Sequence, residues 1–266
     1  MNLSCVILAA GLGKRMKSSL PKVLHRVCGT PMLQSVINTT GGLKPDKLIV
    51  VVGEQMELIK RTVKGEGVIY AFQETPRGTG HALRSAIPAL NGFKGIVLVV
   101  NGDTPLLGGE TLRKFLKLHV KDKNAISVLS FRAGNPDNYG RIVRDASGRV
   151  VSIIEHKDAD SLGKKIPEVN SGVYAINHDA LRLLDEIKIN AAKGEYYLTD
   201  IIARASKKGL KIAAYCMGTE EEFMGVNTRE ELHRASMLVK NNCSMAGAKA
   251  GSGCFAEGKK SSRSRQ

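Results

Sequence analysis

A glycine-rich segment with several cations lies near the start of the chain. Directly after an apolar run it reads Leu8-Ala9-Ala10-Gly11-Leu12-Gly13-Lys14-Arg15-Met16. Small residues allow backbone N–H groups to approach a phosphate closely. The stretch is also basic, and no acidic residue comes before Asp46 to balance its cations, which are Lys14, Arg15, Lys17, Lys22 and Arg26. The segment therefore predicts a binding site for a triphosphate at the end of a strand.

Two commoner phosphate-binding motifs do not fit this segment. A dinucleotide fingerprint needs a third glycine where Met16 stands, and an acidic residue about 20 positions later. A P-loop needs serine or threonine after Gly-Lys, and here Arg15 follows Lys14. An ordinary turn from strand to helix, with lysines that face solvent, stays equally open from this segment alone.

Two later turns also place polar side chains directly after apolar runs. Gln73 is followed by Gly78 and Thr79, and its carboxamide can pair with the edge of a pyrimidine because it both donates and accepts hydrogen bonds. Asp103 follows the apolar run 96–100 and is suited to hold Mg²⁺ on a triphosphate. A plain turn or a helix cap uses the same residue types, so neither turn is specific alone.

The elements expected to position these residues alternate between apolar strands and amphipathic helices. Strands are predicted at 3–8, 47–52, 68–72, 96–100, 125–131, 150–155, 172–176 and 211–216. Helices are predicted between the early strands at 32–40, 54–63, 80–90 and 109–119. Continuous apolar strands separated by helices indicate an α/β fold built on a Rossmann-like, doubly wound, mostly parallel sheet.

Three further parts of the chain are distinguished by their composition. Residues 125–176 are dense in predicted strands and turns, which predicts a small antiparallel lobe beside the main sheet. A closing helix is expected at about 228–241, with Asn227 or Thr228 as its N-cap. Residues 1–243 would then form one domain. Residues 244–266 are rich in Gly, Ala, Ser and Lys/Arg, and are predicted to be a disordered basic tail.

The overall composition argues against several classes of protein. With 266 residues, 42% of them hydrophobic, the chain can bury a core, and no apolar run reaches the roughly 18 residues of a membrane span. Five cysteines without C-x-x-C spacing predict a reducing cytoplasm, with neither a zinc site nor disulfides. The net charge of +15 permits nucleic-acid binding, but aromatic residues that would stack on bases make up only 5%. Specific nucleic-acid binding is therefore not expected.

Together these segments resemble the sugar-nucleotide pyrophosphorylases. The signature is residues 8–16 followed by Leu20-Pro21-Lys22. The run 16–25 is most similar to the N-terminal uridyltransferase domain of bacterial bifunctional N-acetylglucosamine-1-phosphate uridyltransferase/glucosamine-1-phosphate acetyltransferase. The resemblance covers residue 5 to about 235 and implies the nucleotide-diphospho-sugar transferase fold. It also implies a Mg²⁺-dependent reaction of UTP with N-acetylglucosamine-1-phosphate, giving UDP-N-acetylglucosamine and pyrophosphate.

The resemblance further implies roles for individual residues. Arg15 would contact the departing pyrophosphate and Lys22 the transferred phosphate, while Asp103 and Asn227 would hold Mg²⁺. The sugar-phosphate oxygen that attacks the α-phosphorus is already ionised at neutral pH, so no general base is needed. Catalysis would then depend on positioning and charge neutralisation.

The remaining implied site residues bind the two substrates. They are Leu8, Ala9, Ala10, Gly11, Gln73, Gly78, Thr79, Asn101, Gly140, Glu155 and Asn170. Gln73 and Gly78 would read uracil, and the last three would hold the hydroxyls and N-acetyl group of the sugar. Residues 195–200 would form a wall of the sugar pocket.

Two features depart from the resembled family. No hexapeptide repeat occurs in these 266 residues, so neither acetyl transfer nor the trimer formed by that β-helix is expected. Asn101 stands where the family usually has an aromatic residue before Gly-Asp. A uridylyl- or thymidylyltransferase that acts on glucose-1-phosphate therefore stays an alternative. A non-catalytic nucleotide-sugar sensor is another, although the presence of Arg15, Lys22 and Asp103 favours the enzyme.

Overall fold

The computed structural model describes residues 1–191 and 193–251, with residues 242–251 described by their backbone alone. Its strands are β1 (Leu3–Leu8), β2 (Arg26–Val27), β3 (Thr30–Pro31), β4 (Lys47–Val52), β5 (Val68–Phe72), β6 (Ile96–Asn101), β7 (Ile126–Arg132), β8 (Arg141–Arg144), β9 (Val150–Ile154), β10 (Glu168–Asn177) and β11 (Ile212–Cys216). Its α-helices are α1 (Met32–Gly41), α2 (Met56–Thr62), α3 (Thr79–Ser85), α4 (Gly109–Lys121), α5 (Asp200–Lys207) and α6 (Arg229–Gly251). Short 3₁₀ helices complete the fold: η1 (Lys14–Met16), η2 (Lys22–Leu24), η3 (Ile87–Leu90), η4 (Gly163–Lys165) and η5 (His178–Glu186).

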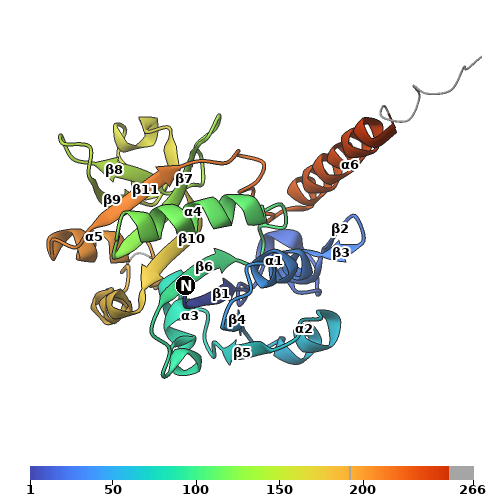
Figure 1. Ribbon diagram of the computed structural model, residues 1–266, viewed down its shortest axis with the longest axis horizontal. Helices are drawn as coiled ribbons and strands as arrows, with labels where there is room; N and C mark the ends of the chain where they lie inside the picture. The colour runs from blue at the N-terminus through green and yellow to red at the C-terminus, as the bar shows by residue number, and fades with distance from the viewer. Residues whose placement is uncertain (192, 252–266) are drawn as a thin grey trace, which may run out of the picture.

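One twisted sheet organises the molecule, with strand order β11-β7-β10-β6-β1-β4-β5 (Figure 1). β1 pairs in parallel with both β4 and β6, β4 with β5, and β7 with β11. Only β10 runs against its neighbours β6 and β7 along this path. The predicted α/β fold with a mostly parallel sheet is therefore confirmed.

The side chains of each central strand alternate between two buried faces. On β1, Cys5 and Ile7 pack in a cluster with residues of α1, α2 and α4. Val6, between them, packs with residues of α3, α5 and η5 on the opposite face. All three β1 side chains are fully buried, as expected for a strand covered by helices on both faces. In Figure 1, α4 crosses in front of the sheet.

The predicted elements agree closely with those in the structure. The strands expected at 3–8, 47–52 and 68–72 have the predicted bounds, and the other predicted strands differ mainly at their ends. The helix expected at 80–90 is divided into α3 and η3, since Pro88 lies within its second half and lacks an N–H to donate. Five elements were not predicted from the sequence: η5, α5 and the short strands β2, β3 and β8.

The antiparallel strands expected at 125–176 are present, but they do not stand apart from the main sheet. β7 and β10 are inner strands of that sheet, and only the β8–β9 hairpin lies off its path, attached to β10. β10 is ten residues long, with six residues buried and four partly buried, so it contributes to the common core along most of its length.

The closing helix α6 starts within a residue of its predicted position and continues to Gly251, past the expected end at 241. The start of the predicted tail is thus helical, in keeping with its alanines, which favour helix. The rest of that tail, residues 252–266, lies outside the described residues. Figure 1 shows α6 projecting away from the body of the molecule.

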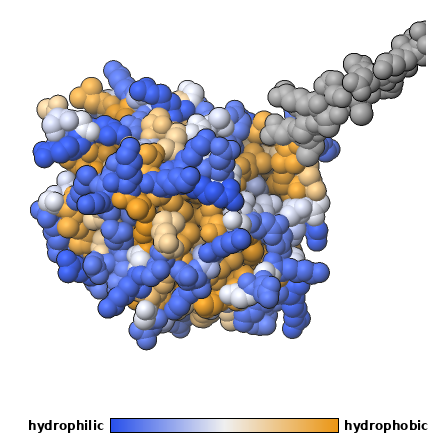
Figure 2. Space-filling model, in the orientation of Figure 1, coloured by the Kyte–Doolittle hydropathy of each residue, from blue (hydrophilic) through white to orange (hydrophobic). Residues whose placement is uncertain are grey.

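Hydrophilic side chains cover much of the face seen in Figure 2, with hydrophobic ones visible between them. Within the described part of the chain, no helix is both long and apolar enough to cross a membrane.

Candidate active site

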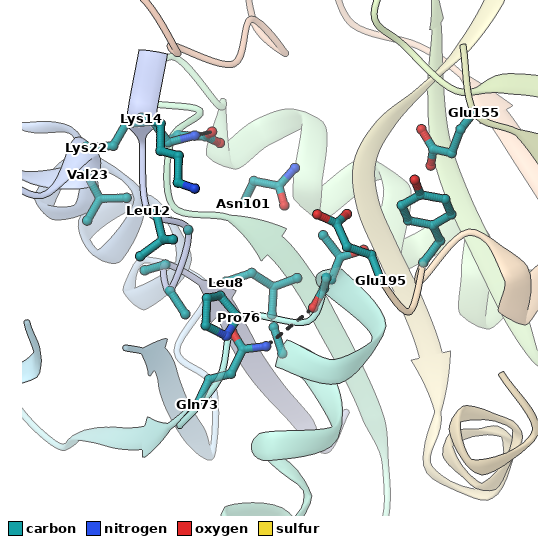
Figure 3. A pocket seen from close by; sticks show the side chains of 18 residues that line it. Leu8, Leu12, Lys14, Lys22, Val23, Gln73, Pro76, Asn101, Glu155 and Glu195 are labelled. Carbon is teal, nitrogen blue, oxygen red and sulfur yellow. Dashed lines mark hydrogen bonds and ion pairs between the residues drawn. The ribbon is translucent and has the colours of Figure 1, made fainter. Parts of the chain in front are cut away.

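The carboxyl ends of β1, β5 and β6 open onto a cavity of about 640 Å³. Such an edge is where open α/β sheets bind their ligands. The cavity is lined by Leu8, Ala9, Ala10, Gly11, Leu12, Lys14, Lys22, Val23, Gln73, Pro76, Gly78, Thr79, Ala82, Asn101, Asp103, Glu155, Glu195 and Tyr197. In Figure 3, Lys14 and Lys22 lie at one end, Gln73 and Pro76 at a second, and Glu155 at a third.

The glycine-rich loop forms the cationic end of this cavity. It leaves β1 while the Ala9 N–H still donates to the Val51 carbonyl at 2.9 Å. It then turns at Gly13, whose φ of +61° is left-handed and favours glycine. A Cβ at Gly13 would lie 2.5 Å from the Cβ of Lys22, so the absence of a side chain lets the loop pack directly on Lys22.

A second close approach brings Asp103 to the same place. The Gly102 N–H donates to the Leu8 carbonyl at 2.9 Å. A Cβ at Gly102 would lie 3.1 Å from the Cβ of Ala9, so glycine allows the turn after β6 to lie against the glycine-rich loop. The Asp103 carbonyl accepts a 2.9 Å hydrogen bond from the Val226 N–H. That bond ties the turn to the segment before α6.

Lys22, Asp103 and Asn227 meet in one hydrogen-bonded group. The Lys22 ammonium donates to Asp103 Oδ2 and, at 2.9 Å, to Asn227 Oδ1. Lys22 and Asp103 are mostly buried, with side-chain exposures of 13% and 18%. The Asn227 amide nitrogen donates to the Gly225 carbonyl at 3.2 Å, which leaves its oxygen facing the lysine. The side-chain oxygens of Asp103 and Asn227, which come from distant parts of the chain, thus both face the Lys22 ammonium.

The N-cap of α6 is supplied by Thr228 and not by Asn227. The Glu231 N–H donates to Thr228 Oγ1 at 3.2 Å, and the Glu231 carboxylate accepts from the backbone N–H groups of Asn227 and Thr228. This reciprocal arrangement is a capping box. Of the two candidates for the cap, Asn227 therefore keeps its side chain for the contact with Lys22.

Gln73 lies at a second end of the cavity, away from Lys14 and Lys22 (Figure 3). Its side chain is almost fully buried, and its amide nitrogen lies 2.8 Å from His81 Nδ1 and 3.4 Å from the Gly78 carbonyl oxygen. Gly78 has a φ of +92°, and a Cβ there would lie 2.6 Å from the Tyr196 carbonyl oxygen. Glycine is therefore required where this turn passes the 195–197 segment.

Glu155 forms the third end of the cavity. Its carboxylate accepts a hydrogen bond from Thr199 Oγ1 at 2.9 Å. Burial raises the pKa of this carboxyl above its ordinary value, and the nearby carboxylates of Asp158, Asp200 and Glu195 add to the rise, while the Thr199 hydrogen bond opposes it. A partly buried carboxylate of this kind suits the hydroxyl groups of a sugar.

Gly140 and Asn170 lie beside Glu155 without lining the cavity itself. A Cβ at Gly140 would lie 3.7 Å from both the Asn170 Cβ and Glu155 Oε1. The Asn170 amide donates to the Tyr174 hydroxyl at 2.8 Å and accepts from the Gly172 N–H at 2.9 Å. Both polar atoms of Asn170 are thus engaged within the protein.

Asn101 lies between the cationic end and the Glu155 end, as Figure 3 shows. It packs on Gly172, where φ is +82° and a Cβ would lie only 2.2 Å from Asn101 Nδ2. Gly172 therefore supplies the space that the Asn101 side chain fills.

The structure brings most of the predicted site residues together. Eleven of them line the cavity: Leu8, Ala9, Ala10, Gly11, Lys22, Gln73, Gly78, Thr79, Asn101, Asp103 and Glu155. Asn227 accepts a hydrogen bond from one of these, Lys22. Arg15 is exposed outside the lining, whereas its neighbour Lys14 is within it. Four further lining residues were not predicted as site residues, although each lies within a few residues of one: Leu12, Val23, Pro76 and Ala82.

We expect Glu155→Gln to raise the midpoint of thermal unfolding at neutral pH by about 2–4 °C. An acid whose pKa is raised by folding stabilises the folded protein at low pH. That stability is lost as the pH rises from the ordinary glutamate range through the raised pKa of the folded protein. Glutamine keeps an oxygen for Thr199 and carries no charge. The difference in unfolding midpoint between Glu155→Gln and the wild type should therefore become smaller in acid. A difference that is equal at all pH values would contradict this reasoning.

Comparison with known proteins agrees with this geometry. Residues 5–176 match the family model described as the MobA-like NTP transferase domain. The chain is 42% identical over 240 residues to a protein of Streptococcus suis named "Bifunctional protein GlmU", covering 90% of this chain and 52% of the relative. A protein of the same name from Caldanaerobacter subterraneus is 45% identical over 239 residues, with the same coverage. The chain thus spans about half the length of these curated relatives.

A solved structure supports the fold independently of sequence. The crystal structure of UDP-glucose pyrophosphorylase complexed with UDP-glucose superposes with a TM-score of 0.73 at 17% identity, covering 91% of this chain and all of that one. A similarity at that identity establishes the architecture alone. Since the family model covers most of the sheet, together with the glycine-rich loop, Gln73 and Asp103, the chain belongs to the MobA-like NTP transferase domain family.

Proposed function

We propose that this domain joins UTP to N-acetylglucosamine-1-phosphate and releases pyrophosphate, forming UDP-N-acetylglucosamine. The observation that carries this proposal is the division of one cavity into three chemically different ends. The Lys14 and Lys22 end suits phosphates, the Gln73 end suits a pyrimidine edge, and the Glu155 end suits sugar hydroxyls. The relatives named "Bifunctional protein GlmU" support the same assignment.

The reaction follows from how the three ends are arranged. A phosphate oxygen of the sugar-1-phosphate attacks the α-phosphorus of UTP, forming one P–O bond as the bond to the β-phosphate oxygen breaks and pyrophosphate leaves. The attacking oxygen is already ionised, so the protein has no proton to remove. Lys22 neutralises charge on the α-phosphate, and Arg15 with Lys14 does so on the leaving pyrophosphate. Aligning the two anions is then the main contribution of the protein.

Asp103 and Asn227 are the residues proposed to hold Mg²⁺. A carboxylate and an amide oxygen are ligands that this ion prefers, and they already converge on the Lys22 ammonium, so the pair fits a cation. Within the described part of the chain, no group of three or more His, Cys, Asp or Glu side chains is placed to hold a metal. A site with few protein ligands agrees with Mg²⁺, which usually keeps waters and substrate phosphates as its other ligands. The bound ion would draw the phosphates together and neutralise their charge.

Within this proposal residues 1–243 act as one nucleotidyltransferase domain, with small molecules as its substrates. Transfer to glucose-1-phosphate is the second candidate, and Asn101 is the observation that favours it. Asn101 lies between the phosphate end and the Glu155 end of the cavity and replaces the aromatic residue usual in the resembled family.

Pyrophosphate release by the purified chain tests both candidates. The reaction contains UTP, Mg²⁺ and N-acetylglucosamine-1-phosphate, with parallel reactions that use glucose-1-phosphate, other nucleoside triphosphates or EDTA. We expect release with UTP and the N-acetylated sugar phosphate, and loss of release with EDTA. Release with glucose-1-phosphate alone would favour the second candidate. Absence of release with every pair would refute the enzyme and leave a nucleotide-sugar sensor.

A further inference from the structure

The amide of Gln73 is held in one orientation by two acceptors. Its nitrogen lies 2.8 Å from His81 Nδ1 and 3.4 Å from the Gly78 carbonyl oxygen. A carbonyl oxygen only accepts hydrogen bonds, so the group facing Gly78 must be the NH₂ of Gln73 and not its oxygen. The same NH₂ faces His81, so Nδ1 of His81 accepts and the proton of the neutral ring is on Nε2.

This arrangement leaves one polar atom of Gln73 for a ligand. Both hydrogens of its NH₂ point to protein acceptors, and Oε1 has no hydrogen bond to any residue that the structure describes. Gln73 lines the cavity and is almost fully buried, so water cannot easily replace a lost partner. A base at this end therefore meets an acceptor from Gln73 and no donor.

We propose that His81 is a positioning residue that fixes the Gln73 amide so that only its oxygen faces the base, which selects uracil over cytosine. The role of His81 rests on the proposed function, because it assumes that a pyrimidine nucleotide binds at this end. Uracil offers a donor at N3–H, which Gln73 Oε1 can accept. Cytosine has an unprotonated N3, which is an acceptor, and two acceptors face to face repel each other.

The surroundings of His81 keep its ring neutral. The ring is half-buried on α3 and stacks on Tyr196 with ring centroids 6.2 Å apart. Burial lowers the pKa of His81, and the guanidinium groups of Arg84, on the same helix, and Arg77, in the preceding turn, lower it further. The neutral ring is the state that can accept from Gln73.

Protonation of His81 would remove the acceptor. Nδ1 would then carry a proton facing the NH₂ of Gln73, and two donors cannot pair. Relief requires that the ring move away or that the amide rotate, and rotation would present NH₂ to the base. Either outcome weakens the selection of uracil, so the affinity for UTP should fall in acid.

Two substitutions of His81 distinguish the effect of its Nδ1 acceptor from that of its aromatic ring. His81→Asn places an oxygen close to the position of Nδ1 and does not titrate, whereas His81→Phe keeps an aromatic ring against Tyr196 but has no acceptor. For His81→Phe we expect the KM for UTP to rise roughly threefold to tenfold and the preference for UTP over CTP to fall by a similar factor. His81→Asn should restore most of both. The KM for the sugar phosphate should change in neither variant, because Glu155 lies at a different end of the cavity.

The pH dependence of the KM for UTP distinguishes the proposed role from a purely structural role of His81, which would not change it. Between about pH 8 and about pH 5, the KM for UTP of the wild type should rise relative to that of His81→Asn, because only the wild type has a ring to protonate here. The titration of the nucleotide phosphates affects both proteins equally, so it cancels in the ratio of their KM values for UTP. Calorimetric measurement of the affinities for UTP and CTP, without the sugar phosphate, compares the two proteins independently of turnover.

The possible outcomes separate this role from the proposed function. If wild-type protein neither turns over nor binds UTP at any pH, the proposed function fails. If the wild type is active but His81→Phe keeps its folded spectrum and its full preference for UTP, His81 does not position Gln73. A pH profile that His81→Asn shares with the wild type would also overturn the role of His81.

Discussion

Asp103→Ala is expected to lower the rate of pyrophosphate release by roughly 10²–10³-fold, the usual loss when one transition-state charge contact is removed. Asp103 is the one carboxylate in the Lys22–Asp103–Asn227 group, and its backbone is fixed on both sides. Gly102 bonds to β1, and the Asp103 carbonyl accepts from Val226. The carboxylate is thus directed into the cavity, and alanine removes a charge without disturbing those backbone bonds. Steady-state rates at saturating UTP and Mg²⁺ measure the loss.

Two companion variants make the Asp103 result specific. Asp103→Asn keeps an oxygen but loses the charge, so it should retain more activity than alanine and need more Mg²⁺ for half-maximal rate. Asp179→Ala removes one carboxylate from a side chain that is 96% exposed, and it should leave the rate unchanged. If Asp103→Ala were folded and as active as Asp179→Ala, Asp103 would have no role in the reaction.

The inner strands of the central sheet were predictable because they are buried on both faces. A strand such as β1 or β4 is apolar at nearly every position and is bounded by turn residues, so its extent can be read with little context. β8 could not be identified this way. It is four residues long, begins with Arg141 and ends with Arg144. Although it forms a hairpin with β9, its attachment to the main sheet depends on the pairing of Arg141 with Val169 of β10, which is distant in sequence. Its fully buried Arg141 would have counted against a strand.

The candidate site was predictable where one short segment supplies several residues at once. The glycine-rich loop and the turns after β5 and β6 place nearly all of their predicted residues on the cavity. The sequence did not indicate that Lys14 would line the cavity and its neighbour Arg15 would not, because this depends on the 3₁₀ turn η1 that contains both. The role of Arg15 at the pyrophosphate stays a prediction. The partnership of Gln73 with His81 is likewise invisible in sequence, since it depends on the rotation of one amide.

Lys22→Met is expected to lower the rate of pyrophosphate release and to raise the affinity for a divalent cation. The rate of pyrophosphate release should fall by roughly 10²–10³-fold, because the ammonium that would neutralise the transferred phosphate is gone. Binding of a divalent cation without nucleotide should become tighter. In the free protein, the Lys22 ammonium donates to the same two oxygens, on Asp103 and Asn227, that are proposed to hold Mg²⁺. Lysine and metal therefore compete for these oxygens, and methionine keeps the length of the side chain without the charge.

Thermal unfolding with and without Mg²⁺ measures the second effect apart from catalysis. A ligand that binds only the folded state raises the unfolding midpoint, and at a fixed ligand concentration the rise is larger when the ligand binds more tightly. Without metal, Lys22→Met should unfold at a lower temperature than the wild type, since Asp103 is mostly buried and has lost its partner. Added Mg²⁺ should then raise the midpoint of the variant more than that of the wild type.

The double variant Lys22→Met/Asp103→Asn is the control for this competition. It lacks both the competing ammonium and the carboxylate, so Mg²⁺ should stabilise it less than Lys22→Met alone. If Mg²⁺ stabilised the wild type and Lys22→Met equally, Lys22 would not compete with the metal, and its contact with Asp103 would be an ordinary ion pair beside the site. If the double variant responded as strongly as Lys22→Met, the ion would bind elsewhere. Only the combination of lower turnover with a larger response to Mg²⁺ in Lys22→Met agrees with a lysine that yields these oxygens to the metal and itself serves the transferred phosphate.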